Sequence, residues 1–234
     1  MSLRHCTVCS VWIALMIGSG CASRSAATAP VAPGVLLRAD EVYAPGRAVR
    51  EFNGGRGGRE TQRRVTGEPD ESGAWELQIL SGMSGELKPV RSLILARGED
   101  GGVLLLRLRD EAEGTVMVFT PPLALLPPKL ESGGVFEGRA NAEVVRIRDR
   151  TIADRGTALS HAEIVADESG TPGRIAWKSR LVFTLSVASI TREMVQSVEP
   201  GAGVIAEQNS LRVKAGPFTV RSADETWTVI RGDQ

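Results

Sequence analysis

The sequence has no cysteine beyond residue 21, and this absence excludes several kinds of site from most of the chain. Its three cysteines are Cys6, Cys9 and Cys21. The region that follows them therefore has no disulfide framework, no thiolate metal site and no cysteine nucleophile. Cys6 and Cys9 have CxxC spacing, but they lie in a short apolar segment at the amino terminus, where we expect them to act only as apolar residues.

Aromatic residues, histidine and net charge are also scarce. Aromatics make up 4% of the chain, which argues against base-stacking platforms. Lys plus Arg and Asp plus Glu both number 28, so no overall field favours nucleic acid. Only His161 lies outside the amino-terminal segment. Because Ser160 and His161 would point to opposite faces of a strand, we expect no nucleophile and base pair there.

Common catalytic motifs are missing as well. The GxSxG, SxxK, HExxH and Walker patterns do not occur. Glu137 and Glu143 share one face of an expected strand, which leaves a carboxylate-based hydrolase as an alternative, although acidic residues on such a face are usually only solvated. We therefore predict a protein that is not an enzyme and that holds no cofactor or metal.

The first 20 residues have the pattern of a signal peptide. Arg4 precedes a predominantly apolar run, Val8 to Ile17, which is shorter than the ~20 residues of a membrane-spanning helix. Small residues then lead to Cys21, and this arrangement resembles the lipobox of bacterial lipoproteins. The resemblance implies that Cys21 is acylated, for example with palmitate, and becomes the first mature residue. Gly18 departs from the aliphatic residue usual there, and ordinary cleavage, for instance after Ala22, is the alternative.

Residues 21–34 are expected to form the lipidated cysteine and a flexible tether. They are mostly Ala, Ser, Thr and Pro with a single charged residue, a composition that buries too little surface to fold. Ala22 is not the aspartate that favours inner-membrane retention in this family, so the resemblance implies an outer-membrane location facing the periplasm. Residues 35–234 are expected to form a single β-rich domain.

Apolar and polar residues alternate through the second half of this domain. Leu104, Leu106 and Leu108 share one face of a run whose other face carries Arg107 and Arg109, a period typical of strands with one buried face. The longest such run covers residues 175–187. The alternation inverts near residue 145, which indicates a bulge, and residues 190–198 are a helix candidate by composition. We predict a mainly β fold, with roughly eight to eleven antiparallel strands in a curved sheet, half-barrel or barrel, and few short helices.

Two segments support a family resemblance. Thr120 to Lys129, with the following Gly133–Gly134 turn, and the later step from Glu199 to Val204 resemble parts of uncharacterised periplasmic half-barrel proteins. These proteins are related to lipoprotein-carrier folds, whose concave face covers an acyl chain. The resemblance implies a half-barrel, and neither segment carries catalytic residues.

The region from Arg47 to Arg64 is rich in arginine. Its six arginines are Arg47, Arg50, Arg56, Arg59, Arg63 and Arg64, against Glu51 and Glu60. Such a run is usually a solvated loop, but arginine also suits contact with anionic headgroups, lipopolysaccharide phosphates or an acidic partner.

Together these features predict an envelope-anchored periplasmic lipoprotein that binds an apolar ligand, such as lipid, on a curved sheet. The alternative is a structural or assembly subunit that docks a protein partner in the envelope. The reason is architectural, because a half-barrel must cover its apolar face with a helix, a ligand or another chain.

Overall fold

The structure, a computed structural model, describes residues 34–46, 50–55, 58–83, 86–165, 174–199 and 201–232. Cys21, Arg47 and Arg56 lie outside the described residues. The only helix among those described is α1 (Ala39–Tyr43). The strands are β1 (Leu36–Arg38), β2 (Arg50–Gly55), β3 (Glu60–Thr66), β4 (Ala74–Gly82), β5 (Lys88–Arg97), β6 (Val103–Asp110), β7 (Thr115–Leu126), β8 (Lys129–Glu131), β9 (Val135–Arg146), β10 (Ile152–Val165), β11 (Ile175–Leu185), β12 (Ser189–Glu199), β13 (Gly203–Ala215) and β14 (Phe218–Gly232).

Twelve strands close into one barrel. Their order is β10-β11-β12-β13-β14-β2-β3-β4-β5-β6-β7-β9, with antiparallel pairing throughout. β8 leaves this sequence of hairpins and pairs with β1 in a separate two-stranded sheet. The mainly β, antiparallel, barrel-like prediction is confirmed, but the strands outnumber the eight to eleven expected, partly because the polar strands β2 and β3 show little alternation.

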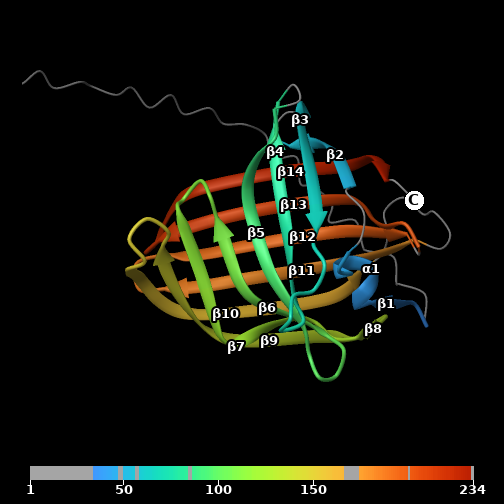
Figure 1. The fold of residues 1–234 in the computed structure, drawn as a ribbon, viewed down its shortest axis with the longest axis horizontal. Coiled ribbons are helices and arrows are strands. Elements are labelled where there is room, and N and C mark those ends of the chain that lie inside the picture. Colours follow the sequence, from blue (N-terminus) through green and yellow to red (C-terminus); the bar gives the residue numbers. More distant parts are fainter. Residues whose placement is uncertain are drawn as a thin grey trace, which may run out of the picture.

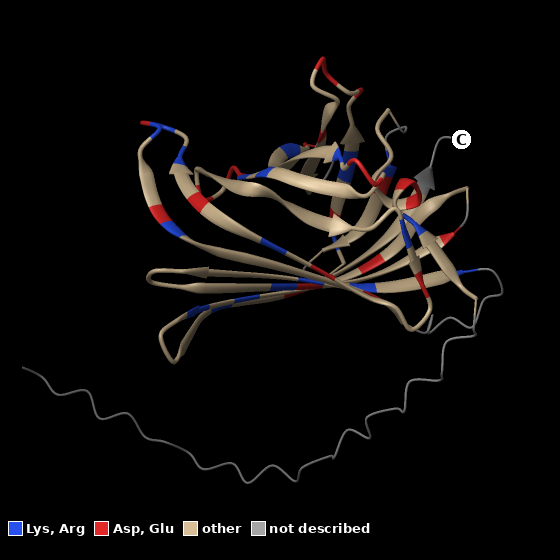
Figure 2. Cartoon of the chain, turned by 90° about the horizontal axis from the view of Figure 1, so that it is seen from below, with Lys and Arg blue, Asp and Glu red and all other residues tan. Residues whose placement is uncertain are grey.

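The barrel is flattened into two layers. In Figure 1, β11 to β14 run side by side across the view, and β3 to β5 cross in front of them. Figure 2, turned by 90°, shows the long strands as a flat layer beneath the rest. α1, β1 and β8 lie together at one end of the long strands (Figure 1).

The apolar face of the sheet is turned inward along most of the barrel. The largest fully buried side chains are Trp177, Trp227, Phe52, Leu37, Leu95, Leu105, Leu123, Leu126 and Val198. The ring of Tyr43, from α1, packs edge-on against Trp177 with centroids 6.4 Å apart. The closed sheet thus hides its apolar face against itself, whereas the sequence had left that role to a helix, a ligand or another chain.

Two local predictions are corrected. The helix candidate at residues 190–198 is strand β12, which pairs with β11 on one side and β13 on the other, so tertiary pairing overrides local composition. The bulge expected near residue 145 lies on the partner strand: Ile152 faces Val145 and Asp154 faces Val144, leaving Ala153 as the extra residue.

Candidate functional site

The residues considered for catalysis are placed apart. Ser160 is buried and donates to the carbonyl of Ala124, whereas His161 lies on the outer face with Nδ1 3.6 Å from Oε1 of Glu137. Glu143 forms an ion pair with Arg155 at 2.8 Å. Glu137 and Glu143 lie six positions apart along β9, roughly 20 Å in an extended strand, which is far beyond the spacing of a glycosidase pair. Neither a nucleophile and base pair nor a carboxylate pair is formed here.

The described arginines of the arginine-rich region do not lie on one surface. Arg63 points outward and pairs with Glu51, while its neighbour Arg64 points into the barrel because successive strand residues face opposite sides. Arg50 is opposite Arg64 in the β2–β3 register and donates to the carbonyl of Val204 at 3.3 Å. Arg59 is exposed. Of the four described arginines, two therefore face the interior and two face solvent, so the described part of the possible anionic-contact patch is divided between two faces.

The interior arginine meets a buried carboxylate. Nη1 of Arg64 lies 3.0 Å from Oε2 of Glu207, which is 3% exposed. Gln196 donates to the same carboxylate, and Nε of Arg192 donates to Oδ1 of Asn209 at 3.0 Å. The Arg64 guanidinium also lies 4.4 Å from the centre of the Phe52 ring, a cation–π distance. Charged and apolar groups thus share the interior.

These contacts shift the pKa values of the groups involved. Burial pushes the pKa of Glu207 upward, but Arg64 and Arg192 together outweigh it and hold that pKa below its usual value of 4.5. Burial, reinforced by the charge of Arg91, lowers the pKa of Arg192 to about 9. Burial and then the Glu207 charge raise the pKa of Tyr43 to about 12.

Sequence reasoning missed this cluster, although a signal was present. Leu211 and Val213 mark the apolar face of β13, and continuing their period of two toward the start of the strand reaches Asn209 and Glu207. A carboxylate on the buried face of a strand needs a partner. Which cation supplies it depends on the barrel and could not be read from β13.

A small cavity lies beside the cluster. It has a volume of about 50 Å³, and its lining includes Tyr43, Arg50, Arg64 and Gln196. Ligand pockets for drug-sized molecules span roughly 300–1,000 Å³. This cavity suits a few atoms at most and has no room for an acyl chain.

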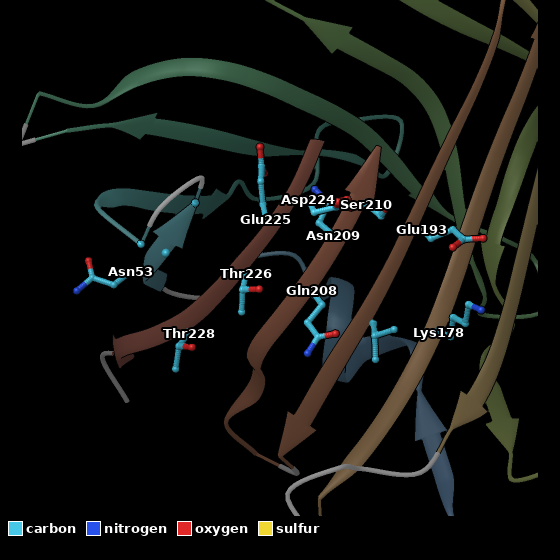
Figure 3. A pocket seen from close by; sticks show the side chains of 14 residues that line it. Asn53, Lys178, Glu193, Gln208, Asn209, Ser210, Asp224, Glu225, Thr226 and Thr228 are labelled. Atoms are coloured by element: carbon cyan, nitrogen blue, oxygen red, sulfur yellow. The ribbon is translucent and has the colours of Figure 1, made fainter. Parts of the chain in front are cut away.

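A much larger hollow lies on the outer face of the long strands. One part, of about 960 Å³, lies over β11 to β14 and the β2–β3 turn, and the adjoining part, of about 810 Å³, lies over β9 to β12. Lys178 and Glu193 line both parts. Figure 3 shows them on neighbouring strands, with Gln208 and Thr226 further along the same face. The lining side chains are mostly polar or charged.

Opposite charges alternate across this hollow. Nε of Arg180 lies 3.5 Å from Oε1 of Glu193, and a third, smaller part of the hollow adds Arg212 and Lys214. Exposed ion pairs of this kind contribute little to stability, about 0–1 kcal/mol. They do give the surface a charge pattern that a partner can match.

The described residues show neither a membrane-spanning helix nor a metal-binding group. In the described part of the chain, no helix is long and apolar enough to cross a membrane, and no group of three His, Cys, Asp or Glu side chains is placed to hold a metal. In comparisons with known proteins, no family model, no curated protein and no solved structure matches this chain.

Proposed function

We propose that this chain is a non-enzymatic lipoprotein of the bacterial envelope whose barrel docks a protein partner in the hollow over β9 to β14. The hollow is the observation that carries the proposal, because it is wide, charged and formed by paired strands. The partner would match its charges, with an acidic group facing Lys178 and Arg180 and a basic group facing Glu193. Anchoring through Cys21, on the periplasmic face of the outer membrane, would hold the barrel near envelope partners.

A photo-reactive cross-linker tests the docking face in intact cell envelopes. Placed at Ser210, which lines the hollow, it should give one discrete adduct. A matched cross-linker at Glu76, exposed on β4 in the other layer, should not. Equal labelling from both positions, or no adduct at Ser210, would argue against docking in the hollow.

Anchoring is tested separately by the intact mass of the protein extracted from membranes. We expect a diacyl or triacyl increment on Cys21. An unmodified mature chain would remove the anchor from the proposal and leave the docking face to be judged by the cross-linking result.

An apolar ligand inside the barrel is the second candidate. The closed interior has no room for an acyl chain, so such a ligand requires the wall to open, and the β14–β2 seam favours this. The pairs between these strands begin at Thr226, so Phe218–Glu225 pair only with β13 among the described residues. Because β14 pairs with β2 over only about half of its length, this seam is the place where the barrel would open to an acyl chain. Lipid extraction from the purified Cys21→Ser protein decides the matter: about one lipid per chain supports a carrier, and lipid-free protein rules it out.

A further inference from the structure

Three hairpins end side by side at one end of the long strands. Their turns lie between β9 and β10, between β11 and β12, and between β13 and β14. The strand registers place them together, because Gly156 of β10 faces Leu185 of β11 and Ser189 of β12 faces Lys214 of β13. The first two ends are also joined directly, since Asp154 accepts a hydrogen bond from the Ser186 hydroxyl at 2.6 Å. These ends, here called the hairpin rim, lie on the left of Figure 1, and Figure 2 shows the hairpin ends on that side spread apart from one another.

Each hairpin end presents large apolar side chains to solvent. Val187 and Phe218 are both 73% exposed, Val220 is 61% exposed and Ile152 is 47% exposed. One exposed apolar residue on a surface is ordinary, but four on three turns at the same end of the barrel make that end a candidate binding surface.

Basic residues outnumber acidic ones in these three turns and their flanks, although the β6–β7 turn, which carries Glu111 and Glu113, borders them: the N–H of Ile147 donates to the carbonyl of Gly114. Between residues 146 and 153, between 185 and 189, and between 212 and 221, the only acidic residue is Asp149. The basic residues there are Arg146, Arg148, Arg150, Arg212, Lys214 and Arg221. Arg221 is paired with Glu113 at 3.0 Å. Figure 2 shows Asp and Glu as well as Lys and Arg segments toward the hairpin ends on this side.

We propose that this hairpin rim, defined by the turns at residues 147–151, 186–188 and 216–217, binds the surface of an anionic phospholipid bilayer. Exposed apolar side chains flanked by Lys and Arg suit the boundary between headgroups and acyl chains, where the apolar groups enter and the cations meet lipid phosphates. An acidic protein would satisfy the cations but would leave Phe218 and Val187 to find matching pockets. The rim thus adds a second membrane contact, carried by the fold itself, to the anchor proposed at Cys21.

Both contacts can reach one bilayer. The described chain starts at residue 34, near β1, at the end of the strands away from the rim. β14, with 15 residues, spans about 50 Å. Residues 21–34, if extended, would reach a similar distance, about 45 Å. The barrel could then lie along the membrane to which it is tethered.

Vesicle flotation of the full chain carrying Cys21→Ser tests the rim without any acyl anchor. The vesicles contain phosphatidylcholine with or without one third phosphatidylglycerol. We expect binding to the anionic vesicles that weakens as salt rises from low to physiological concentration, and weaker binding to neutral vesicles. Val187→Asp combined with Phe218→Asp should lower the partition coefficient by about tenfold or more, because both apolar contacts are lost and negative charge is added.

Val135→Asp is the matched control. Val135 is 58% exposed at the start of β9, at the opposite end of the sheet, so its replacement should leave vesicle binding unchanged. Circular dichroism checks that each variant is folded. The proposal is overturned if the unaltered Cys21→Ser chain ignores anionic vesicles, or if the rim variant and the Val135 variant bind equally. Neither result depends on whether Cys21 is acylated or whether the outer hollow docks a partner.

Discussion

Arg64 and Glu207 form an ion pair across the interior of the barrel, with 3.0 Å between Nη1 and Oε2. Their strands, β3 and β13, are not neighbours, because β14 and β2 lie between them in the barrel. Both side chains are largely removed from water, with relative exposures of 13% and 3%. The pair therefore links parts of the wall that share no backbone hydrogen bonds, and its loss would leave a buried charge without its partner.

Removing the interior arginine should destabilise the protein far more than removing its neighbour. We expect Arg64→Gln to lower the free energy of unfolding by about 3 kcal/mol, because Glu207 stays buried without its ion-pair partner. Arg63→Gln breaks only the outer contact with Glu51 and should cost less than about 1 kcal/mol. Urea unfolding measures both. Equal losses would contradict the placement of the two arginines on opposite faces.

Acid should weaken the fold through Glu207. Its pKa is lowered in the folded protein, so its contribution is present above the unfolded value and disappears as pH falls through the folded one. Thermal unfolding should show the loss below about pH 4.5, the ordinary value of this group. Glu207→Gln should be less stable at neutral pH and should lose less on acidification. An unchanged acid slope in this variant would assign the effect to other carboxylates.

The single tyrosine of the chain reports on the interior directly. Burial first, and then the Glu207 charge, raise the pKa of Tyr43 to about 12 from 10.0. Because the folded value is raised, its contribution to stability is complete below pH 10 and is lost as pH rises toward 12. Tyrosinate absorbance should show a higher midpoint in folded protein than in urea. A folded midpoint near 10 would mean that α1 does not seal the ring from water.

The seam between β2 and β14 should not tolerate a side chain at Gly54. Its φ is +155°, and a Cβ there would overlap the carbonyl oxygen of Thr226. We expect Gly54→Ala to lower the free energy of unfolding by about 2 kcal/mol or more, from backbone strain and lost pairing. Gly133→Ala, at φ +79° with open space around it, carries strain alone and should cost about 1 kcal/mol. Denaturant unfolding compares them, and a neutral Gly54 variant would show that the seam is loose.

Alternation was a good guide for most strands with one apolar face. It was wrong for the first half of β6, where Val103 and Leu105 are buried rather than Leu104 and Leu106, because a register shift follows Leu105.

The longest alternating run of the sequence, residues 175–187, coincides with β11, although β14 is the longest strand. Trp75, Trp177 and Trp227, on the apolar faces of their runs, are all buried. Alternation also correctly placed the side chains of Ser160 and His161 on opposite faces of their strand. It was a poor guide for β2, β3 and the start of β13, because polar residues occupy inward positions there, and only a partner on another strand makes their burial favourable.

The amino-acid sequence by itself determined the β class, the turn at Gly133–Gly134 and the inward face of most apolar strands, since these depend on residues within a few positions of one another. Only the tertiary structure decided that the sheet closes, that β8 leaves the barrel to pair with β1, and that Arg64 meets Glu207. Such features depend on the register between strands far apart in the chain. An alternation with a period of two residues predicts to which face a side chain points, but it does not predict which residue that side chain contacts.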